Sequence, residues 1–181
     1  MSILSVFDHS RPEQPNKVLS YPEDIASTLA AVGVRFERWQ ASAPIRPGAG
    51  QNEVLEACRP AIDRLMAEGG YRAVDLISVT DDHPQKVELR GQFFDEHRHA
   101  EDEVRLFVAG RGLFNLHIGD YVYALLCEKG DLIVVPAGTA HWFDMGEAPR
   151  FVTIRLFNRP EGLDAEFTGN DIARRFPQLE E

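Results

Sequence analysis

The chain has 181 residues, 44% of them hydrophobic and 27% charged, and its formal net charge at pH 7 is −10. This length suits one domain whose core is large enough to be stable without disulfides. The negative charge argues against nucleic acid or an anionic membrane as a partner, because both carry charge of the same sign.

The first part of the chain, about residues 1–90, is predicted to be mixed and partly helical. Pro22, followed by two acidic residues, marks the start of a helix, and Gly33 follows the last residue of its apolar stripe. Residues 34–40 (VRFERWQ) alternate as a strand does, whereas residues 41–51 (ASAPIRPGAGQ) have the Pro and Gly content of a loop.

A second helix is predicted over residues 52–71 (NEVLEACRPAIDRLMAEGGY). Pro60 falls inside it and predicts a kink or a restart, and the pair Gly69-Gly70 is a plausible C-terminal cap. Residues 73–80 (AVDLISVT) read as a strand, and residues 84–94 (PQKVELRGQFF) as a short helix or irregular turn.

The second part of the chain is a series of short strand-like runs, each closed by Gly or Asp turn signals. The runs are EVRLFVAGRG, LFNLHIG, DYVYALLCEKG, DLIVVPAG and RFVTIRLFN, with turn signals at 110–112, 119–120 and 130–131. This spacing is typical of an antiparallel sandwich or barrel, and the tail at 170–181 predicts one more helical turn. We therefore predict one domain over residues 1–181, mainly β with accessory helices (α+β), whose barrel motifs occupy about residues 91–160.

Cysteine usage and the N-terminus both favour a cytoplasmic protein. Cys58 and Cys127 form no CxxC or metal-binding spacing, so we expect both to be reduced and buried. The N-terminus has no basic region and too short an apolar run for a signal peptide. The sequence contains no run of about 18 apolar residues, so no transmembrane helix is expected.

Two histidines, His97 and His99, lie one residue apart among acidic residues. Alternate residues of a strand face the same side, so both imidazoles can reach one metal ion. Glu103 lies four residues further on, about 13 Å away along an unbroken strand, whereas metal ligands lie about 2 Å from the ion. Residues 100–102 must therefore bend if Glu103 joins the site. An exposed, solvated loop explains the HxH pattern equally well.

A second pattern, from Gly130 to His141, combines an apolar strand, a Pro-x-Gly turn and a histidine that this turn can direct inward. Together with the first pattern, it matches G-x5-HxH-x3-E-x6-G over 91–110 and G-x5-PxG-x2-H over 130–141. The chain thereby resembles the cupin superfamily, which implies a double-stranded β-helix, or jelly-roll barrel. Met145 stands where the second motif often has Asn. The resemblance implies one metal ion bound by His97, His99, Glu103 and His141.

The resemblance extends to the bacterial acireductone dioxygenases, over about residues 32–176. It includes DEHRHAEDEVRLFV, GLFNLHIGD, LCEKGDLIVVPAGTAHWFDMG and FTGNDIA. The chain departs from some relatives at Leu163, where a tryptophan is expected. This resemblance implies that O2 cleaves 1,2-dihydroxy-3-keto-5-(methylthio)pentene in methionine salvage, with one Fe2+ or Ni2+ per monomer. It also implies that the iron form yields 4-methylthio-2-oxobutanoate and formate, and the nickel form methylthiopropionate, formate and CO.

The implied ligand set agrees with this chemistry. Three imidazoles and one carboxylate leave two positions open in an octahedron, and they suit Fe(II), Ni(II), Co(II) or Mn(II). A closed tetrahedral zinc site would leave no position for a substrate.

Four further side chains are candidates for catalysis or substrate binding. Arg105 shares strand parity with Glu103 and is expected to pair with an anionic substrate, or else with an acidic neighbour at the surface. Asp102 is expected to accept a proton or to orient a histidine ligand, and a solvated turn residue is an equal alternative. Phe93 and Phe143 flank the motifs, and the resemblance places them in the substrate pocket rather than the core.

The other three histidines are expected at the surface. His117 alternates with apolar residues on a strand, which directs it outward, and His9 and His83 lie in turn-rich segments. Glu101 is likewise expected to face solvent.

Other functions remain open on the same motifs. They are a quercetinase-like dioxygenase, a metal-dependent sugar-phosphate isomerase and a non-enzymatic ligand-binding cupin. An isomerase needs no O2 and is expected to have more basic residues to bind the phosphate of its substrate. We expect a monomer whose partners are the small-molecule acireductone and O2, with no nucleic acid and no membrane.

Overall fold

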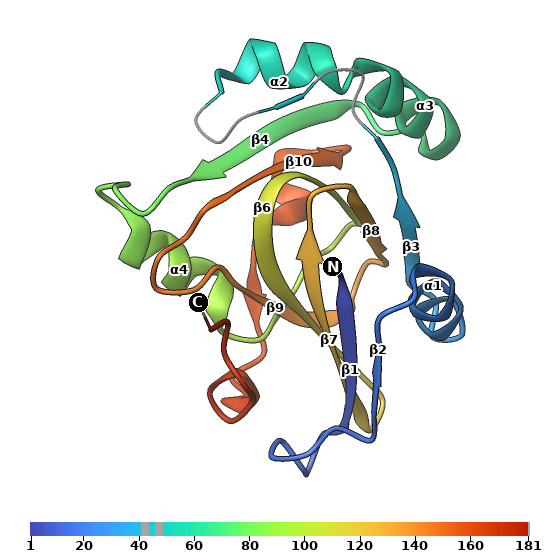
Figure 1. The fold of residues 1–181 in the computed structure, drawn as a ribbon, viewed down its shortest axis with the longest axis vertical. Coiled ribbons are helices and arrows are strands. Elements are labelled where there is room, and N and C mark those ends of the chain that lie inside the picture. The colour runs from blue at the N-terminus through green and yellow to red at the C-terminus, as the bar shows by residue number, and fades with distance from the viewer. Residues whose placement is uncertain (41–43, 46–48, 181) are drawn as a thin grey trace.

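Eleven strands pair antiparallel in the computed structural model, which describes residues 1–40, 44–45 and 49–180. Most of them curl around a barrel interior, as Figure 1 shows. The strands are β1 (Ile3–Asp8), β2 (Lys17–Leu19), β3 (Arg35–Arg38), β4 (Ala73–Val79), β5 (His97–Arg98), β6 (Glu103–Ile118), β7 (Tyr121–Glu128), β8 (Asp131–Val135), β9 (Ala140–Asp144), β10 (Phe151–Phe157) and β11 (Glu166–Phe167).

The helices cover the outside of this barrel. They are α1 (Pro22–Ala30), α2 (Gln51–Ala57), α3 (Arg59–Gly69) and α4 (Lys86–Phe94), with the 3-10 turns η1 (Pro160–Leu163) and η2 (Ile172–Arg174). Helices α2 and α3 lie across one end, above β4, and α1 packs beside β3 (Figure 1). None of the described helices is long and apolar enough to cross a membrane.

Most of the predicted helices are confirmed. The predicted second helix is two helices, because Pro60 lies in the first turn of α3 and the chain restarts at Cys58. Gly70 caps α3 in the left-handed conformation, and residues 86–94 form α4. The predicted loop at 41–51 lies partly outside the described residues. The sequence analysis missed β1 and β2, although the buried Leu4 and Val6 flank the less buried Ser5 in β1.

Strand β6 runs unbroken through the turn predicted at 110–112, and that prediction is wrong. Its first half pairs with β8 and β10, and its second half with β7 and β9. Gly110 has φ +69° and pairs with Phe151 of β10, and the pairing shifts register just before it, between Phe107 and Ala109. A Cβ atom at Gly110 would lie 1.7 Å from the Arg150 carbonyl oxygen. The glycine signal therefore marks a bend that lets one strand serve both halves of the barrel.

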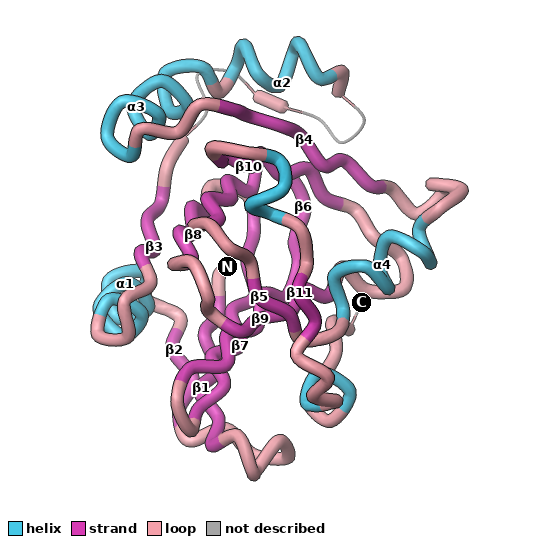
Figure 2. The backbone as a smooth tube through the Cα atoms, turned by 180° about the vertical axis from the view of Figure 1, so that it is seen from behind, coloured by secondary structure: helices cyan, strands magenta, loops and turns pink. Residues whose placement is uncertain are grey.

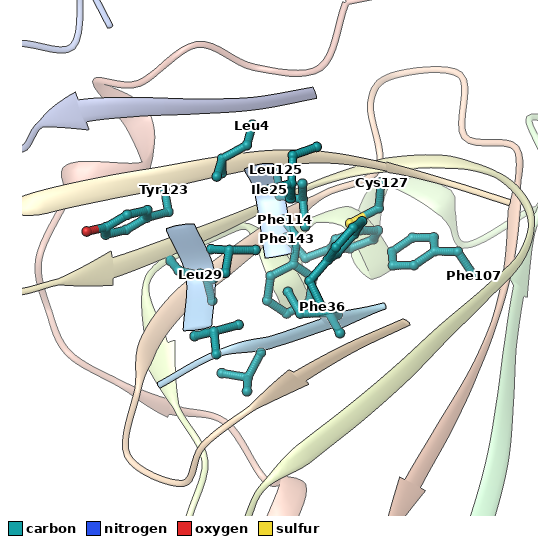
Figure 3. Packing of buried hydrophobic residues seen from close by; sticks show 14 of the residues in the cluster. Leu4, Ile25, Leu29, Phe36, Phe107, Phe114, Tyr123, Leu125, Cys127 and Phe143 are labelled. Carbon is teal, nitrogen blue, oxygen red and sulfur yellow. The ribbon is translucent and has the colours of Figure 1, made fainter. Parts of the chain in front are cut away.

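Aromatic side chains from β6 and β9 fill the barrel interior. Phe107, Phe114 and Phe143 pack there with Leu125 of β7, as Figure 3 shows. Both cysteines are free and buried, as expected, and burial raises the pKa of the Cys58 thiol to about 11. The core supports the rigid strands from which the functional side chains project.

Candidate metal centre

The three histidines of the two motifs converge from neighbouring strands. His97 lies in β5 directly opposite His141 in β9, and His99 follows β5. One ring nitrogen from each lies within 4.8 Å of the others. Figure 2 shows the adjoining strands β11, β5 and β9 from behind. This arrangement brings together side chains that are more than 40 residues apart in the sequence.

The Nδ1 atom of each of these histidines lies within hydrogen-bond distance of a backbone carbonyl oxygen. The acceptors belong to Asp95 for His97 (2.7 Å), to Thr139 for His141 (2.8 Å) and to Asp164 for His99 (3.2 Å). A carbonyl oxygen accepts only, so Nδ1 carries the proton and Nε2 keeps a lone pair. This is the usual state of a histidine that ligates a metal through Nε2.

Glu103, the first residue of β6, completes the cluster. Its Oε2 atom lies 3.3 Å from Nε2 of both His99 and His141, yet it is buried and makes no hydrogen bond within the described structure. Ligands about 2.1 Å from one ion are about 3.0 Å apart when they are adjacent in an octahedron. The spacing and the unsatisfied carboxylate oxygen therefore fit a divalent cation among these four side chains.

The protonation states also fit a cation. Burial lowers the pKa of His97 to about 4, with help from the neighbouring His141 and His99 rings, so the ring is neutral at pH 7. Burial would raise the pKa of Glu103, but the charge of Arg105 and the proximity of His141 and His99 hold it well below its ordinary range. The centre thus offers a neutral His97 imidazole and an ionised Glu103 carboxylate, the forms that bind metals.

The bend that the sequence analysis required lies between His99 and Glu103. Residues 100–101 form it, and the two motifs are hydrogen-bonded to each other there. Asp102 Oδ1 accepts the Ala137 N–H at 2.8 Å, and the Gly138 N–H donates to the His99 carbonyl at 2.9 Å. Asp102 is exposed, and its carboxylate holds the turn that precedes His141.

Arg105 is buried beside the centre and faces the same interior as Glu103. Its Nη2 atom donates to Glu103 Oε1 at 2.7 Å, whereas Nε and Nη1 make no hydrogen bond within the described structure. Burial lowers the pKa of Arg105, and the adjacent Glu103 charge opposes that change. An Arg remains charged under these conditions. Two donors of a buried cation are therefore free for an anionic ligand.

Aromatic rings surround this guanidinium. It lies 4.8 Å from the centroid of the Phe143 ring, 5.5 Å from Phe114 and 5.8 Å from Phe93. Phe143 and Phe114 are fully buried (Figure 3), and Phe93 is half-buried at the end of α4. The two predicted phenylalanines thus lie on one side of Arg105, although Phe143 also belongs to the core cluster.

Several residues at the centre were missed by sequence reasoning. Phe114 stacks on the His141 ring with 9° between the planes, and Phe167 contacts the His97 ring. Glu96 is buried and bonds His117 and Thr168, although it directly precedes His97 in the motif. Strand parity with Leu116, which faces His141, could have indicated Phe114.

One expectation about a surface residue needs correction. Glu101 does not simply face solvent, since its carboxylate pairs with Arg159 and also accepts the Arg159 N–H. Leu163, at the point of departure from some relatives, is buried at the end of η1, next to the Asp164 carbonyl that holds His99. Met145 is buried in the core and supplies no polar group near the second motif.

Comparison with known proteins agrees with this geometry. The model of the ARD/ARD' family matches residues 4–165. Proteins named acireductone dioxygenase from Stutzerimonas stutzeri (strain A1501) and Pseudomonas fluorescens (strain Pf0-1) are each 69% identical over 181 residues, which is 100% of both chains. The structure of an acireductone dioxygenase from Bacillus anthracis with a cadmium ion in its active center matches with a TM-score of 0.81 and 28% identity, over 92% of this chain and 98% of that one.

The fold is accordingly the expected cupin barrel, mainly β with accessory helices. The matches span the barrel together with the helical first part, so they go beyond the two short motifs. The chain belongs to the ARD/ARD' family, and with it to the acireductone dioxygenases.

Proposed function

We propose that the chain cleaves a methylthio-substituted acireductone with O2 in methionine salvage. The observation that carries the proposal is the buried His97–His99–His141–Glu103 group beside two free donors of Arg105. Relatives of 65% to 69% identity over the full length are named acireductone dioxygenase, which supports the same substrate class here.

We propose that His97, His99, Glu103 and His141 hold one Fe2+ or Ni2+ per monomer. A bound ion would supply Lewis-acid chemistry and a template for the substrate oxygens. The ligand set does not select sharply between the two metals, because imidazole and carboxylate donors suit both. The neutral state of His97 and the unsatisfied Oε2 of Glu103 support the assignment.

The chain's own residues would bind and orient the substrate. Arg105 donates from Nε and Nη1 to the anionic enediolate and offsets part of its charge. Phe93 and Phe143 contact the apolar methylthio end, next to the same guanidinium. The surrounding apolar barrel excludes water and so strengthens each charged contact.

Asp102 is our candidate for the group that accepts a proton from the substrate. Its Oδ1 atom accepts the Ala137 N–H, which fixes the side chain at the turn that precedes His141. Its Oδ2 atom makes no hydrogen bond with another described residue. A carboxylate held at one oxygen and free at the other is suited to proton transfer.

We propose further that the protein acts as a monomer in the cytoplasm, on small molecules rather than nucleic acid or membranes. All the ligands, Arg105 and both phenylalanines come from one chain, so the site needs no second copy. The net charge of −10 supports the exclusion of anionic polymers as partners.

Metal exchange tests the proposed function. Protein stripped of metal is reloaded with Fe2+ or Ni2+, given freshly prepared acireductone, and followed by O2 uptake and product analysis. We expect formate and 4-methylthio-2-oxobutanoate from the iron form, and methylthiopropionate, formate and CO from the nickel form. Identical products would contradict metal-selected chemistry. Absence of O2 uptake in both forms would contradict the dioxygenase and favour an isomerase or a binding protein.

A further inference from the structure

Two histidines outside the metal centre face each other across the end of β7. His9 follows β1, and His117 lies near the end of β6. The Nδ1 atom of His9 is 3.1 Å from Nε2 of His117. Their side chains are 39% and 15% exposed, so the pair is open to solvent on the His9 side. The expectation that His117 faces outward is therefore wrong, and His9, expected to be exposed, is partly covered.

Carboxylates lie at the far nitrogen of each ring. Glu96 Oε2 is 2.6 Å from His117 Nδ1, and Asp120 Oδ1 is 3.9 Å from His9 Nε2. Glu96 is buried, and its other oxygen accepts the Thr168 hydroxyl. Because an ionised carboxylate only accepts, the proton of a neutral His117 lies on Nδ1. The Nε2 atom of His117 then presents a lone pair to His9.

This geometry requires a cation or a proton between the rings. If the proton of a neutral His9 lies on Nε2, the lone pairs of His9 Nδ1 and His117 Nε2 lie 3.1 Å apart with no proton between them. That separation is close to the value of about 3.0 Å for adjacent ligands that lie about 2.1 Å from one metal ion. The Glu96 carboxylate bound to His117 is the usual arrangement behind a ligating imidazole, whereas Asp120 lies near His9 at 3.9 Å.

We propose that His9 and His117 form a second divalent transition-metal site, which takes Ni2+, Zn2+ or Cu2+ and is completed by water. Imidazole nitrogens suit these ions, and the negative charges of Glu96 and Asp120 favour a cation between the rings. With two protein ligands in place of four, this site binds more weakly than the main centre. It also differs from that centre in drawing on the N-terminal segment.

The second site changes how metal contents are interpreted. Protein exposed to excess nickel or zinc would hold two ions per chain, and only one would lie among His97, His99, Glu103 and His141. A metal-to-protein ratio above one is then a property of the fold and not a sign of denatured protein.

Stoichiometry in the presence of Ni2+ tests this proposal without reference to turnover. Untagged, metal-free protein is titrated with Ni2+ by calorimetry, and the bound metal is measured after equilibrium dialysis. We expect two equivalents in the native protein, the second weaker than the first. His9→Gln is expected to lose only the second equivalent. The control His83→Gln alters a half-buried histidine in another turn and is expected to keep both.

Nitrogen NMR of the native protein with Zn2+ provides a measurement that needs no variant. We expect the His9 Nδ1 and His117 Nε2 resonances to shift with the second equivalent and not with the first. If only one equivalent binds at up to about 1 mM metal, or if the imidazole resonances do not change when the second equivalent is added, the two rings share only a proton. A second equivalent that survives in His9→Gln would place it elsewhere and overturn the assignment.

Discussion

Removal of the Arg105 cation is expected to suppress turnover while the metal stays bound. Arg105→Met keeps an apolar side chain of similar length among Phe93, Phe114 and Phe143 and removes all donors. Glu103 keeps its free Oε2 atom in this variant, so its contact with a cation is not lost directly. Arg105→Lys retains the charge but loses the planar set of donors.

The magnitude follows from the two free donors. Each charge-assisted hydrogen bond contributes about 1.5–3 kcal/mol, so the loss of Nε and Nη1 together costs about 3–6 kcal/mol. One factor of ten in rate corresponds to about 1.36 kcal/mol. We therefore expect kcat/KM of Arg105→Met to fall by about 10²–10⁴-fold, and that of Arg105→Lys by less.

Steady-state kinetics on metal-loaded protein, together with elemental analysis, measure this effect. The control is Arg35→Met, which removes a 41% exposed arginine that pairs with Glu37 and Glu68 at the surface, and which we expect to leave kinetics unchanged. Wild-type kcat/KM in Arg105→Met with a full metal complement would refute a contact between Arg105 and the substrate. Loss of metal along with activity would instead assign Arg105 to supporting Glu103.

Three further predictions concern the metal and the fold. Alanine substitutions of single ligands are expected to lose most bound metal, and full occupancy by elemental analysis would remove that residue from the set His97, His99, Glu103 and His141. In metal-free protein, burial lowers the pKa of His97 from 6.5 to about 4, so the folded state favours the neutral ring. The free energy of unfolding is therefore undiminished by His97 above pH 6.5 and decreases as the pH falls toward 4. Urea unfolding should register a loss of about 3 kcal/mol, absent in His97→Gln. Gly110→Ala should lower the melting temperature far more than Gly119→Ala. Both glycines have positive φ, but only a Cβ atom at Gly110 would clash with backbone atoms. Equal decreases in melting temperature would exclude this clash.

The candidate metal centre was predictable because its proposed ligands obey short, fixed spacings. His97 and His99 share a face by strand periodicity, and the required bend before Glu103 follows from the reach of an extended chain. The groups that orient these ligands had no such signal. The acceptors for the Nδ1 atoms are backbone carbonyls, and the one for His99 belongs to Asp164, 65 residues away. A backbone oxygen carries no side-chain identity that a sequence pattern could report.

Charge patterns near the centre were ambiguous for a related reason. Glu96, Glu101 and Asp102 lie in one acidic stretch, yet Glu96 is buried, Glu101 pairs with Arg159 and Asp102 is exposed. Local sequence offers no period that separates them, because the strand ends after Arg98 and the chain bends. The same limit applies to Gly110. A glycine signal in the sequence is the same whether the chain makes a turn there or a strand bends, so the sequence alone does not separate the two.

The balance of charge explains why an arginine lies buried beside a metal centre at all. A histidine ligand binds a metal as a neutral ring, and Glu103 and Arg105 cancel as a pair 2.7 Å apart. A divalent cation therefore leaves the buried site with two positive charges, and a substrate dianion returns it to neutrality. Without Arg105, the same complex would carry one uncompensated negative charge, which is costly in an apolar interior. Arg105 consequently acts most strongly when the dianion is bound, so its removal should weaken substrate binding, whereas loss of its positive charge does not by itself weaken the affinity of the empty site for a metal cation.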